Sequence, residues 1–468
     1  MYRHKESTGC AVKTAISAQW ALLPGGWASD VRVEIDAEGR IAGVATGAAP
    51  GVSDQRVPFL LPAVSNLHSH TFQRAMAGLA ERRGPSGRDS FWTWRAVMYR
   101  FLDILTPDEI EAIAAFAFME MLEAGFSAVA EFHYLHHQPG GAGYDDPGEL
   151  SARIVAASAT AGIGLTLLPV YYRHGGVDGR PLAGGQLRFG CDRDRFERLL
   201  SGASASVKAL PADAAMGVAP HSLRAVGIDD LAWASALMPG RPVHMHLAEQ
   251  EQEVDETLAV HGARPVPLLL DCAAVDGRWC LIHCTQMQPG ETARLAATGA
   301  TAGLCPVTEA NLGDGPFNGP AYLEAGGAFG VGSDSNVNIS LTEELRTLEY
   351  SQRLRDLARN VLVVGEGSVG QTLYLGAATG GAQALGRDAG EIAPGRLADL
   401  VAIDSTAPAL CALGRDQLLD GLVFAAKDDV VTDLWSAGRH AVQSGRHVAR
   451  ARIVAAYRTA IAELLASV

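Results

Sequence analysis

The sequence predicts an α/β fold: a (β/α)8 TIM-like barrel joined to a small β-sandwich domain that both ends of the chain build. Three observations support this prediction. Eight short apolar runs recur through the middle of the chain, helical patterns separate most of them, and extended alternating segments lie at both ends. Apolar strands that alternate with helices indicate a parallel sheet buried on both faces.

Residues 1–57 are predicted to form the first part of the β-sandwich domain. Apolar and polar residues alternate from Trp20 to Gly47, on either side of the turn signals Pro-Gly-Gly at 24–26 and Glu-Gly-Arg at 38–40. A period of two is typical of a strand with one buried face. The segment should therefore contain antiparallel strands.

The barrel is predicted to span residues 58–386. Its strands are expected at 58–64, 127–132, 163–170, 215–220, 242–248, 279–284, 300–305 and 328–333. One intervening helix is well marked, because Thr106, Pro107 and Glu109 form a capping pattern and Gly125 follows as a stop signal. A doubly wound open sheet is the alternative, which the missing glycine-rich phosphate loop after the first strand weakens.

Residues 387–468 are predicted to complete the sandwich domain and to end in a helix. Extended alternation returns in GEIAPGRLADLVAID, and a hairpin pattern follows in VTDLWSAGRHAVQSGR. The final segment, RIVAAYRTAIAELLASV, has the apolar spacing of an amphipathic helix.

Composition and charge argue against several classes of protein. The 468 residues include 38 Lys and Arg against 52 Asp and Glu, a net charge of −14, so a nucleic-acid partner is not expected. No apolar run reaches the roughly 18 residues of a membrane span, and no apolar stretch follows the charged N-terminus as in a signal peptide. The seven Cys form no CxxC pair, so no disulfide framework is expected. A cytoplasmic enzyme is the expectation.

The barrel prediction directs attention to the strand ends, where such barrels carry their chemistry. His68 and His70, then His133 with Tyr134, His221, His246, His283 and Asp334 follow the predicted strands, although the chain has only 14 His. A single His at a strand end is more often structural, and a single Asp there is more often a helix cap. Several strand ends that converge favour a site.

These side chains include a set of ligands for a metal. His68 and His70 are two residues apart on a strand, so both imidazoles can face one ion. With His246 and Asp334 they form a nitrogen and oxygen set that suits Zn²⁺, with Fe²⁺ as an alternative, and not Mg²⁺ or Ca²⁺. Glu249, three residues after His246, and His283 are placed to move protons. His244 is expected to be a buried supporting residue.

This pattern resembles the amidohydrolase superfamily, which has His-x-His after strand 1, His after strands 5 and 6, and Asp after strand 8. Its two-metal members carry a lysine at the end of strand 4, where this chain has Val-Ala-Pro-His at 218–221. The resemblance therefore implies one metal ion per chain. It also implies that Glu249 shuttles protons, that His283 polarises the carbon under attack, and that Asp334 binds metal and accepts the proton of the attacking water.

Five segments resemble the formimidoylglutamate deiminases, which convert N-formimino-L-glutamate to N-formyl-L-glutamate and ammonia in histidine breakdown. They are PAVSNLHSHTFQRAMAG, SFWTWRAVMYR, EFHYLHH, APHSLRAV and CPVTEANLGDGPFN. Other relatives tend to carry a Ser-Asn pair after strand 7, where this chain has Thr-Glu-Ala-Asn at 308–311. The resemblance implies a homodimer and a substrate-binding set of Gln73, Arg95, Tyr134, His221 and Arg224.

A dicarboxylate substrate agrees with the two arginines, because guanidinium groups bind carboxylates well. The net charge of −14 repels such a substrate at long range, so binding must depend on a local positive site of metal, Arg95 and Arg224. The aromatic neighbours Trp92 and Trp94 are expected in a lid or a subunit contact. Two alternatives stay open: another one-metal deaminase or chlorohydrolase that acts on a purine or triazine, and an inactive barrel used as a scaffold.

Overall fold

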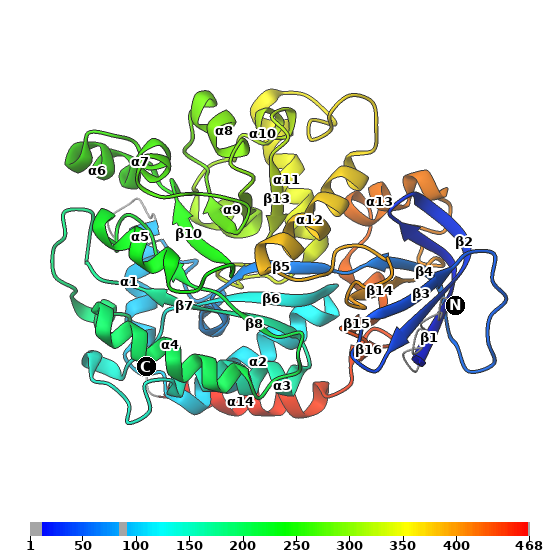
Figure 1. Ribbon diagram of the computed structural model, residues 1–468, viewed down its shortest axis with the longest axis horizontal. Coiled ribbons are helices and arrows are strands. Elements are labelled where there is room, and N and C mark those ends of the chain that lie inside the picture. The colour runs from blue at the N-terminus through cyan, green and yellow to red at the C-terminus, as the bar shows by residue number, and fades with distance from the viewer. Residues whose placement is uncertain (1–11, 84–90, 467–468) are drawn as a thin grey trace, which may run out of the picture.

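The computed structural model describes residues 12–83 and 91–466, which form a barrel and a curved sheet beside it (Figure 1). The barrel strands are all parallel and run toward the side of the molecule where α1, α5 and α6 lie. They are β5 (Val64–Ser69), β6 (Phe126–His133), β7 (Gly164–Tyr171), β8 (Ala215–Met216) with β9 (Ala219–Pro220), β10 (Val243–Leu247), β11 (Trp279–His283), β12 (Thr301–Leu304) and β13 (Ala328–Val331).

The strands close into a ring. One parallel run joins β5, β6, β7 and the β8–β9 segment, and another joins β10 to β13. Parallel bridges between Val218 and Val243 and between Ser69 and Asp334 connect the two runs. The predicted (β/α)8 barrel is thus confirmed, and the doubly wound alternative is wrong.

The first predicted barrel strand was misplaced. The apolar run at 58–64 falls mostly in β4 (Gln55–Pro62), which pairs with β1 and β14 in the sheet outside the barrel. The first barrel strand is β5, which begins after Ala63. Both strands are apolar, so their composition could not separate them, and only their pairing partners distinguish them. We propose that the sheet gives way to the barrel at Ala63 and not at residue 57.

Helices surround the barrel. α2 (Pro107–Glu123) begins with the predicted capping box between Thr106 and Glu109, and Gly125 follows its end with φ of +101°. The others are α1 (Phe91–Leu102), α3 (Glu149–Ala161), α4 (Arg193–Val207), α5 (Ile228–Ala236), α6 (Glu251–His261), α7 (Pro265–Cys272), α8 (Pro289–Ala296), α9 (Pro306–Leu312), α10 (Gly319–Glu324), α11 (Leu341–Asp356), α12 (Val369–Leu385), α13 (Arg415–Phe424) and α14 (Arg450–Ala466). The C-terminal α14 lies along α2, where Tyr457 stacks on Phe116 with centroids 3.9 Å apart. None of the described helices is long and apolar enough to cross a membrane.

The second body is a curved sheet from both ends of the chain, in the order β17-β16-β15-β14-β4-β1-β2-β3. Its further strands are β1 (Val12–Leu23), β2 (Gly26–Asp36), β3 (Ile41–Ala45), β14 (Leu400–Ile403), β15 (Val431–Ser436), β16 (Arg439–Gln443) and β17 (Arg446–His447). The sheet curves back on itself, since Ile41 donates to the carbonyl of Arg396 just before β14. It encloses an apolar core of its own that includes Ile16, Val33 and Trp435.

A buried cluster of ions joins the two bodies. Arg387, after α12, bonds Asp399 at 2.6 Å and Asp213 at 3.1 Å. Asp213 lies just before β8 of the barrel, and Arg439 of the sheet bonds it at 2.7 Å. The side chains of Arg387, Asp399 and Asp213 are at most 5% exposed. This group, which we call the junction cluster (Asp213, Arg387, Asp399 and Arg439), fixes how sheet and barrel meet.

Candidate active site

A pocket with about 550 Å³ of empty space opens at the carboxyl ends of the barrel strands. Every predicted site residue except His68 lines it, and the side chain of His68 lies beneath it, fully buried. The pocket residues from the predicted set are His70, Gln73, Arg95, Tyr134, His221, Arg224, His246, Glu249, His283 and Asp334. Residues scattered over most of the barrel sequence therefore meet in one place.

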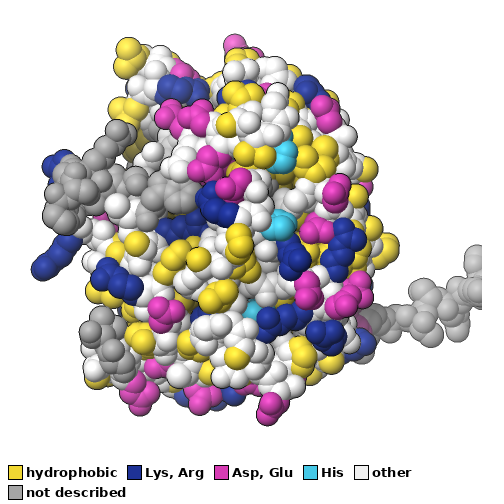
Figure 2. Space-filling view, turned by 90° about the vertical axis from the view of Figure 1, so that its left-hand side faces the viewer, with side chains coloured by type: hydrophobic (Ala, Val, Ile, Leu, Met, Phe, Trp, Pro, Cys, Tyr) yellow, Lys and Arg dark blue, Asp and Glu magenta, His cyan; other side chains and the backbone are white. Residues whose placement is uncertain are grey.

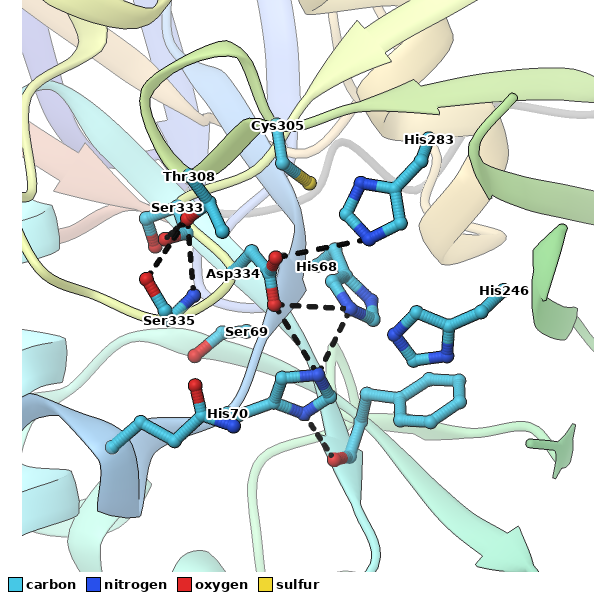
Figure 3. Close-up of polar contacts among 12 residues, drawn as sticks. His68, Ser69, His70, His246, His283, Cys305, Thr308, Ser333, Asp334 and Ser335 are labelled. Atoms are coloured by element: carbon cyan, nitrogen blue, oxygen red, sulfur yellow. Dashed lines mark hydrogen bonds and ion pairs between the residues drawn. The ribbon is translucent and has the colours of Figure 1, made fainter. Parts of the chain in front are cut away.

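Three imidazoles converge on one point at the base of the pocket (Figure 3). A ring nitrogen from each of His68, His70 and His246 lies within 4.8 Å of the others, and the Nε2 atoms of His68 and His70 are 3.2 Å apart. Asp334 faces them, with Oδ1 3.6 Å from Nε2 of His68 and 3.3 Å from Nε2 of His70. The structure brings the predicted ligand set together.

Hydrogen bonds behind the rings orient two of these imidazoles. Nδ1 of His70 donates to the carbonyl oxygen of Phe132 at 3.0 Å, and Nδ1 of His246 donates to that of His221 at 3.1 Å. Each bond leaves Nε2 with a free lone pair that can ligate a metal. His244, predicted to be buried, is fully buried and donates to Ala384, which ties β10 to α12.

The electrostatics of this group fit a divalent cation. Burial lowers the pKa of His70 to about 3 and those of His68 and His246 well below the usual range, so all three rings are neutral donors. Burial raises the pKa of Asp334 to about 7. The four side chains offer lone pairs and one carboxylate but no positive charge, an imbalance that a first-row metal ion corrects.

The backbone at these strand ends is bent sharply. His283 and Asp334 have φ of +71° and +44°, in the left-handed region that non-glycine residues rarely adopt. Such residues cost on the order of 1–3 kcal/mol each and cluster at functional sites. A Cβ at Gly332 would lie 2.7 Å from the backbone of His68, so this glycine lets the end of β13 approach β5 closely.

Glu249 lies beside the imidazole group and is held by an arginine. Its Oε2 accepts a hydrogen bond from Arg224 at 2.5 Å, and its Oε1 is 3.9 Å from Nε2 of His283. Burial by itself would raise the pKa of Glu249, but the charges of Arg224 and His283 outweigh burial and lower it. The predicted substrate-binding Arg224 thus lines the pocket while it pairs with the predicted proton shuttle.

His283 contacts three carboxylates. Nδ1 is 3.3 Å from Oε1 of Glu309, and Nε2 is 3.8 Å from Oδ2 of Asp334. Burial lowers the pKa of His283, but the bond to Glu309 and the charges of Glu249 and Asp334 raise it to about 10. These carboxylates therefore favour the protonated form of the ring, which lines the pocket.

The opposite wall carries the other predicted substrate-binding residues. Gln73 donates through Nε2 to the hydroxyl of Tyr134 at 2.7 Å, while its Oε1 has no hydrogen-bond partner among the residues that the structure describes. Arg95, in α1, donates to the hydroxyl of Tyr172 at 2.9 Å. His221 bonds the adjacent Ser222.

Two residues at the site to which the sequence analysis gave no role are Glu309 and Tyr172. Glu309 follows β12 in a segment that contributed only to the family resemblance, and no role was predicted for it. Tyr172 directly follows β7, so a search of strand ends that included tyrosines would have found it. Of the aromatic residues near Arg95, Trp94 lines the pocket, and the side chain of Trp92 lies outside the described part of the chain.

The surface around the pocket mouth has mixed charge. On the side where α1, α5 and α6 lie, Lys and Arg side chains are interspersed with Asp and Glu among the coloured residues of Figure 2. No broad patch of one sign dominates that view. That face therefore shows no patch of one sign that would attract an anionic ligand.

Comparison with known proteins identifies relatives over nearly the whole chain. Residues 59–441 match the model of the amidohydrolase family, and residues 13–57 match that of the formimidoylglutamate deiminase HutF N-terminal domain. A formimidoylglutamate deiminase from Pseudomonas aeruginosa is 48% identical, and the match covers 97% of this chain and 100% of that protein. A 5-methylthioadenosine/S-adenosylhomocysteine deaminase from Halobacterium salinarum is 28% identical over 81% of each chain.

Solved structures agree with this result. A crystal structure of an amidohydrolase from Brucella melitensis superimposes with a TM-score of 0.93 at 50% identity, over 97% of this chain and 100% of that one. An adenosine deaminase from Xanthomonas campestris with bound zinc shares the fold, with a TM-score of 0.80 at 22% identity over 97% and 99%. The chain therefore belongs to the amidohydrolase family, as predicted, and within it to the formimidoylglutamate deiminases.

Proposed function

We propose that this chain hydrolyses N-formimino-L-glutamate to N-formyl-L-glutamate and ammonia, as a step of histidine breakdown. The observation that carries the proposal is one pocket that combines a metal-binding group, three acid–base residues and two arginines. The relative from Pseudomonas aeruginosa, which is aligned over its whole length, is named for this activity.

The pocket chemistry suits a dicarboxylate that carries an amidine-like group. Arg95 and Arg224 supply two guanidinium groups, which bind carboxylates with charge-assisted hydrogen bonds. Oε1 of Gln73 lacks a partner among the described residues, so it can accept a bond from an N–H of the formimino group. Tyr134 and His221 complete the proposed binding set.

We propose one Zn²⁺ per chain, held by His68, His70, His246 and Asp334, with Fe²⁺ as the alternative. A divalent ion at such ligands supplies Lewis acidity, which makes hydroxide available near neutral pH. The amidohydrolase family supports a metal, and the neutral imidazoles support a first-row ion.

The acid–base residues have distinct tasks in the proposed reaction. A water oxygen adds to the formimino carbon, and the water proton passes through Asp334 or Glu249 to the imino nitrogen, which becomes an amino group. His283 donates through Nε2 to stabilise the tetrahedral centre. The hydroxyl proton of this centre then passes through Glu249 to the amino nitrogen, the formyl C=O forms as the C–N bond breaks, and ammonia leaves. The 3.9 Å between Glu249 and His283 lets both groups serve one reacting centre.

We also propose, from the family resemblance, that the enzyme is a homodimer and acts in the cytoplasm. Light scattering of the purified protein tests the dimer directly.

The activity is tested by measuring ammonia release from N-formimino-L-glutamate, with guanine and a triazine as comparison substrates. We expect the formimino compound to be preferred by several orders of magnitude in kcat/KM. A preference for guanine or the triazine would favour another one-metal deaminase or chlorohydrolase, and no release from any of the three would favour the scaffold.

Replacing Arg95 with methionine should raise the KM for N-formimino-L-glutamate about tenfold to a hundredfold, because a hydrogen bond to a charged group contributes about 1.5–3 kcal/mol. Arg100→Met is the matched control, since Arg100 is exposed on the same helix. Steady-state kinetics decide the outcome. An unchanged KM in the Arg95→Met variant would remove Arg95 from the binding set.

Removing the metal should abolish activity. After treatment with a chelator, ammonia release should fall by about a hundredfold or more, since the Lewis acid contributes several kcal/mol. Adding back Zn²⁺ or Fe²⁺ separately, with metal analysis of each sample, shows which ion restores it. Full activity in a protein shown to be metal-free would contradict the proposed ligand set.

A further inference from the structure

Glu309 lies behind His283, on the side away from the reacting centre. It comes from α9, which follows β12, and its side chain is 6% exposed. Its Oε1 is 3.3 Å from Nδ1 of His283 and also accepts a bond from the backbone N–H of Cys305 at 2.9 Å. The carboxylate therefore bridges the catalytic imidazole and the start of a helix.

The contact determines how the imidazole is presented. A carboxylate only accepts hydrogen bonds, so Nδ1 of His283 must carry a hydrogen that points toward Glu309. The ring is then turned so that Nε2 faces Glu249 at 3.9 Å and Asp334 at 3.8 Å. Partners behind a functional imidazole commonly fix its tautomer and orientation in this way.

A purely structural role for Glu309 is the competing explanation, because its bond to Cys305 also caps α9. That helix start has a second anchor, however. Glu344, from α11, accepts a hydrogen bond from the N–H of Val307 at 3.0 Å. The start of α9 is therefore held by Glu344 as well as by Glu309. The bond to Nδ1 of His283, in contrast, depends on Glu309.

We propose that Glu309 is a positioning residue, which holds His283 through Nδ1 so that Nε2 faces the reacting atoms. This proposal rests on the proposed deiminase activity and adds to it a residue that does not touch the substrate. It also gives a role to the glutamate that follows strand 7, where other relatives tend to carry a Ser-Asn pair.

The test compares Glu309→Ala with Glu309→Gln, because glutamine keeps an oxygen that can accept from both Nδ1 and the Cys305 N–H. We expect kcat to fall about tenfold to a hundredfold in Glu309→Ala, with KM within about twofold, and most of the loss to be recovered in Glu309→Gln. Glu324→Ala, at an exposed glutamate of α10, is the matched control. A loss confined to KM, or one equally large in both variants, would overturn the proposal.

A double-mutant cycle separates positioning from capping. If Glu309 acts through His283, then Glu309→Ala should lower kcat little further in a His283→Ala background. Equal losses in both backgrounds would show that Glu309 acts by another route. Thermal melting and metal content, measured on every variant, show whether folding and metal binding are retained.

A spectroscopic signal keeps the test independent of turnover. In protein with ¹⁵N-labelled histidine, a ring N–H resonance that disappears in His283→Ala should be shifted far downfield, retained in Glu309→Gln and lost in Glu309→Ala. Its persistence in Glu309→Ala would overturn the proposal. If wild-type protein releases no ammonia from the formimino substrate, the proposed function fails, while this signal still reports on the contact.

Discussion

Glutamine in place of Glu249 is expected to lower the turnover of N-formimino-L-glutamate by about a hundredfold or more, while the protein keeps its metal. The side chain is buried beside the metal-binding group, held by Arg224 at 2.5 Å and close to His283. Glutamine retains an oxygen for the bond from Arg224 but cannot accept and return a proton. The geometry should therefore survive, and the proton transfer should not.

Single-turnover and steady-state kinetics, together with metal analysis, measure this effect. Glu251→Gln is the matched control, because Glu251 is exposed at the start of α6. Near-normal turnover in Glu249→Gln would exclude the proton-shuttle role. A variant that loses its metal would instead show that Glu249 supports the ion.

Methionine in place of Arg387 is expected to destabilise the protein by about 3–5 kcal/mol, the usual result of removing one partner from a buried ion pair. Arg387 bonds both Asp399 and Asp213, and Asp399 is completely buried. Without the guanidinium, both carboxylates lose a bonded positive charge inside the protein, although Arg439 still contacts Asp213.

Denaturant unfolding followed by circular dichroism tests this expectation, with Arg359→Met at an exposed arginine as the control. The transition midpoint should drop markedly for Arg387→Met and stay unchanged for the control. If both variants unfold like the wild type, the junction cluster contributes no net stability. Because Asp213 precedes β8, at the amino end of a barrel strand, and no residue of the junction cluster lines the pocket, the KM of the folded variant should be normal.

The barrel could be predicted because its strands are short, apolar and separated by helices, a pattern that local sequence carries. The separate pairing of β4 and β5 could not be predicted, since both strands are apolar and differ only in their pairing partners. His68, His246 and Asp334 could be located because a (β/α)8 barrel carries its chemistry at the carboxyl ends of its strands. The barrel brings these ends together at one face.

Contacts between side chains of different loops could not be predicted from the positions of the strand ends. The bond between Arg224 and Glu249 joins different strand ends, and nothing in the local pattern of either residue signals it. The same holds for Glu309, whose contact with His283 joins the start of α9 to the end of β11. Side-chain pairing across loops is a property of the folded chain, so the structure was needed to show it.

The order in which the ribosome releases the strands matters for this fold. β4 can pair with β1 as soon as both are synthesised, but its other edge pairs with β14, so Leu60 can meet Ala402 only after the whole barrel has been synthesised. Until then an apolar strand edge is open, and such edges invite pairing with other chains. Asp399, the ion-pair partner of Arg387, is also synthesised only at this late stage. A chain whose translation stops within the barrel should therefore keep an exposed edge on β4 and be prone to aggregate. The sheet can be completed only once β14 has been synthesised.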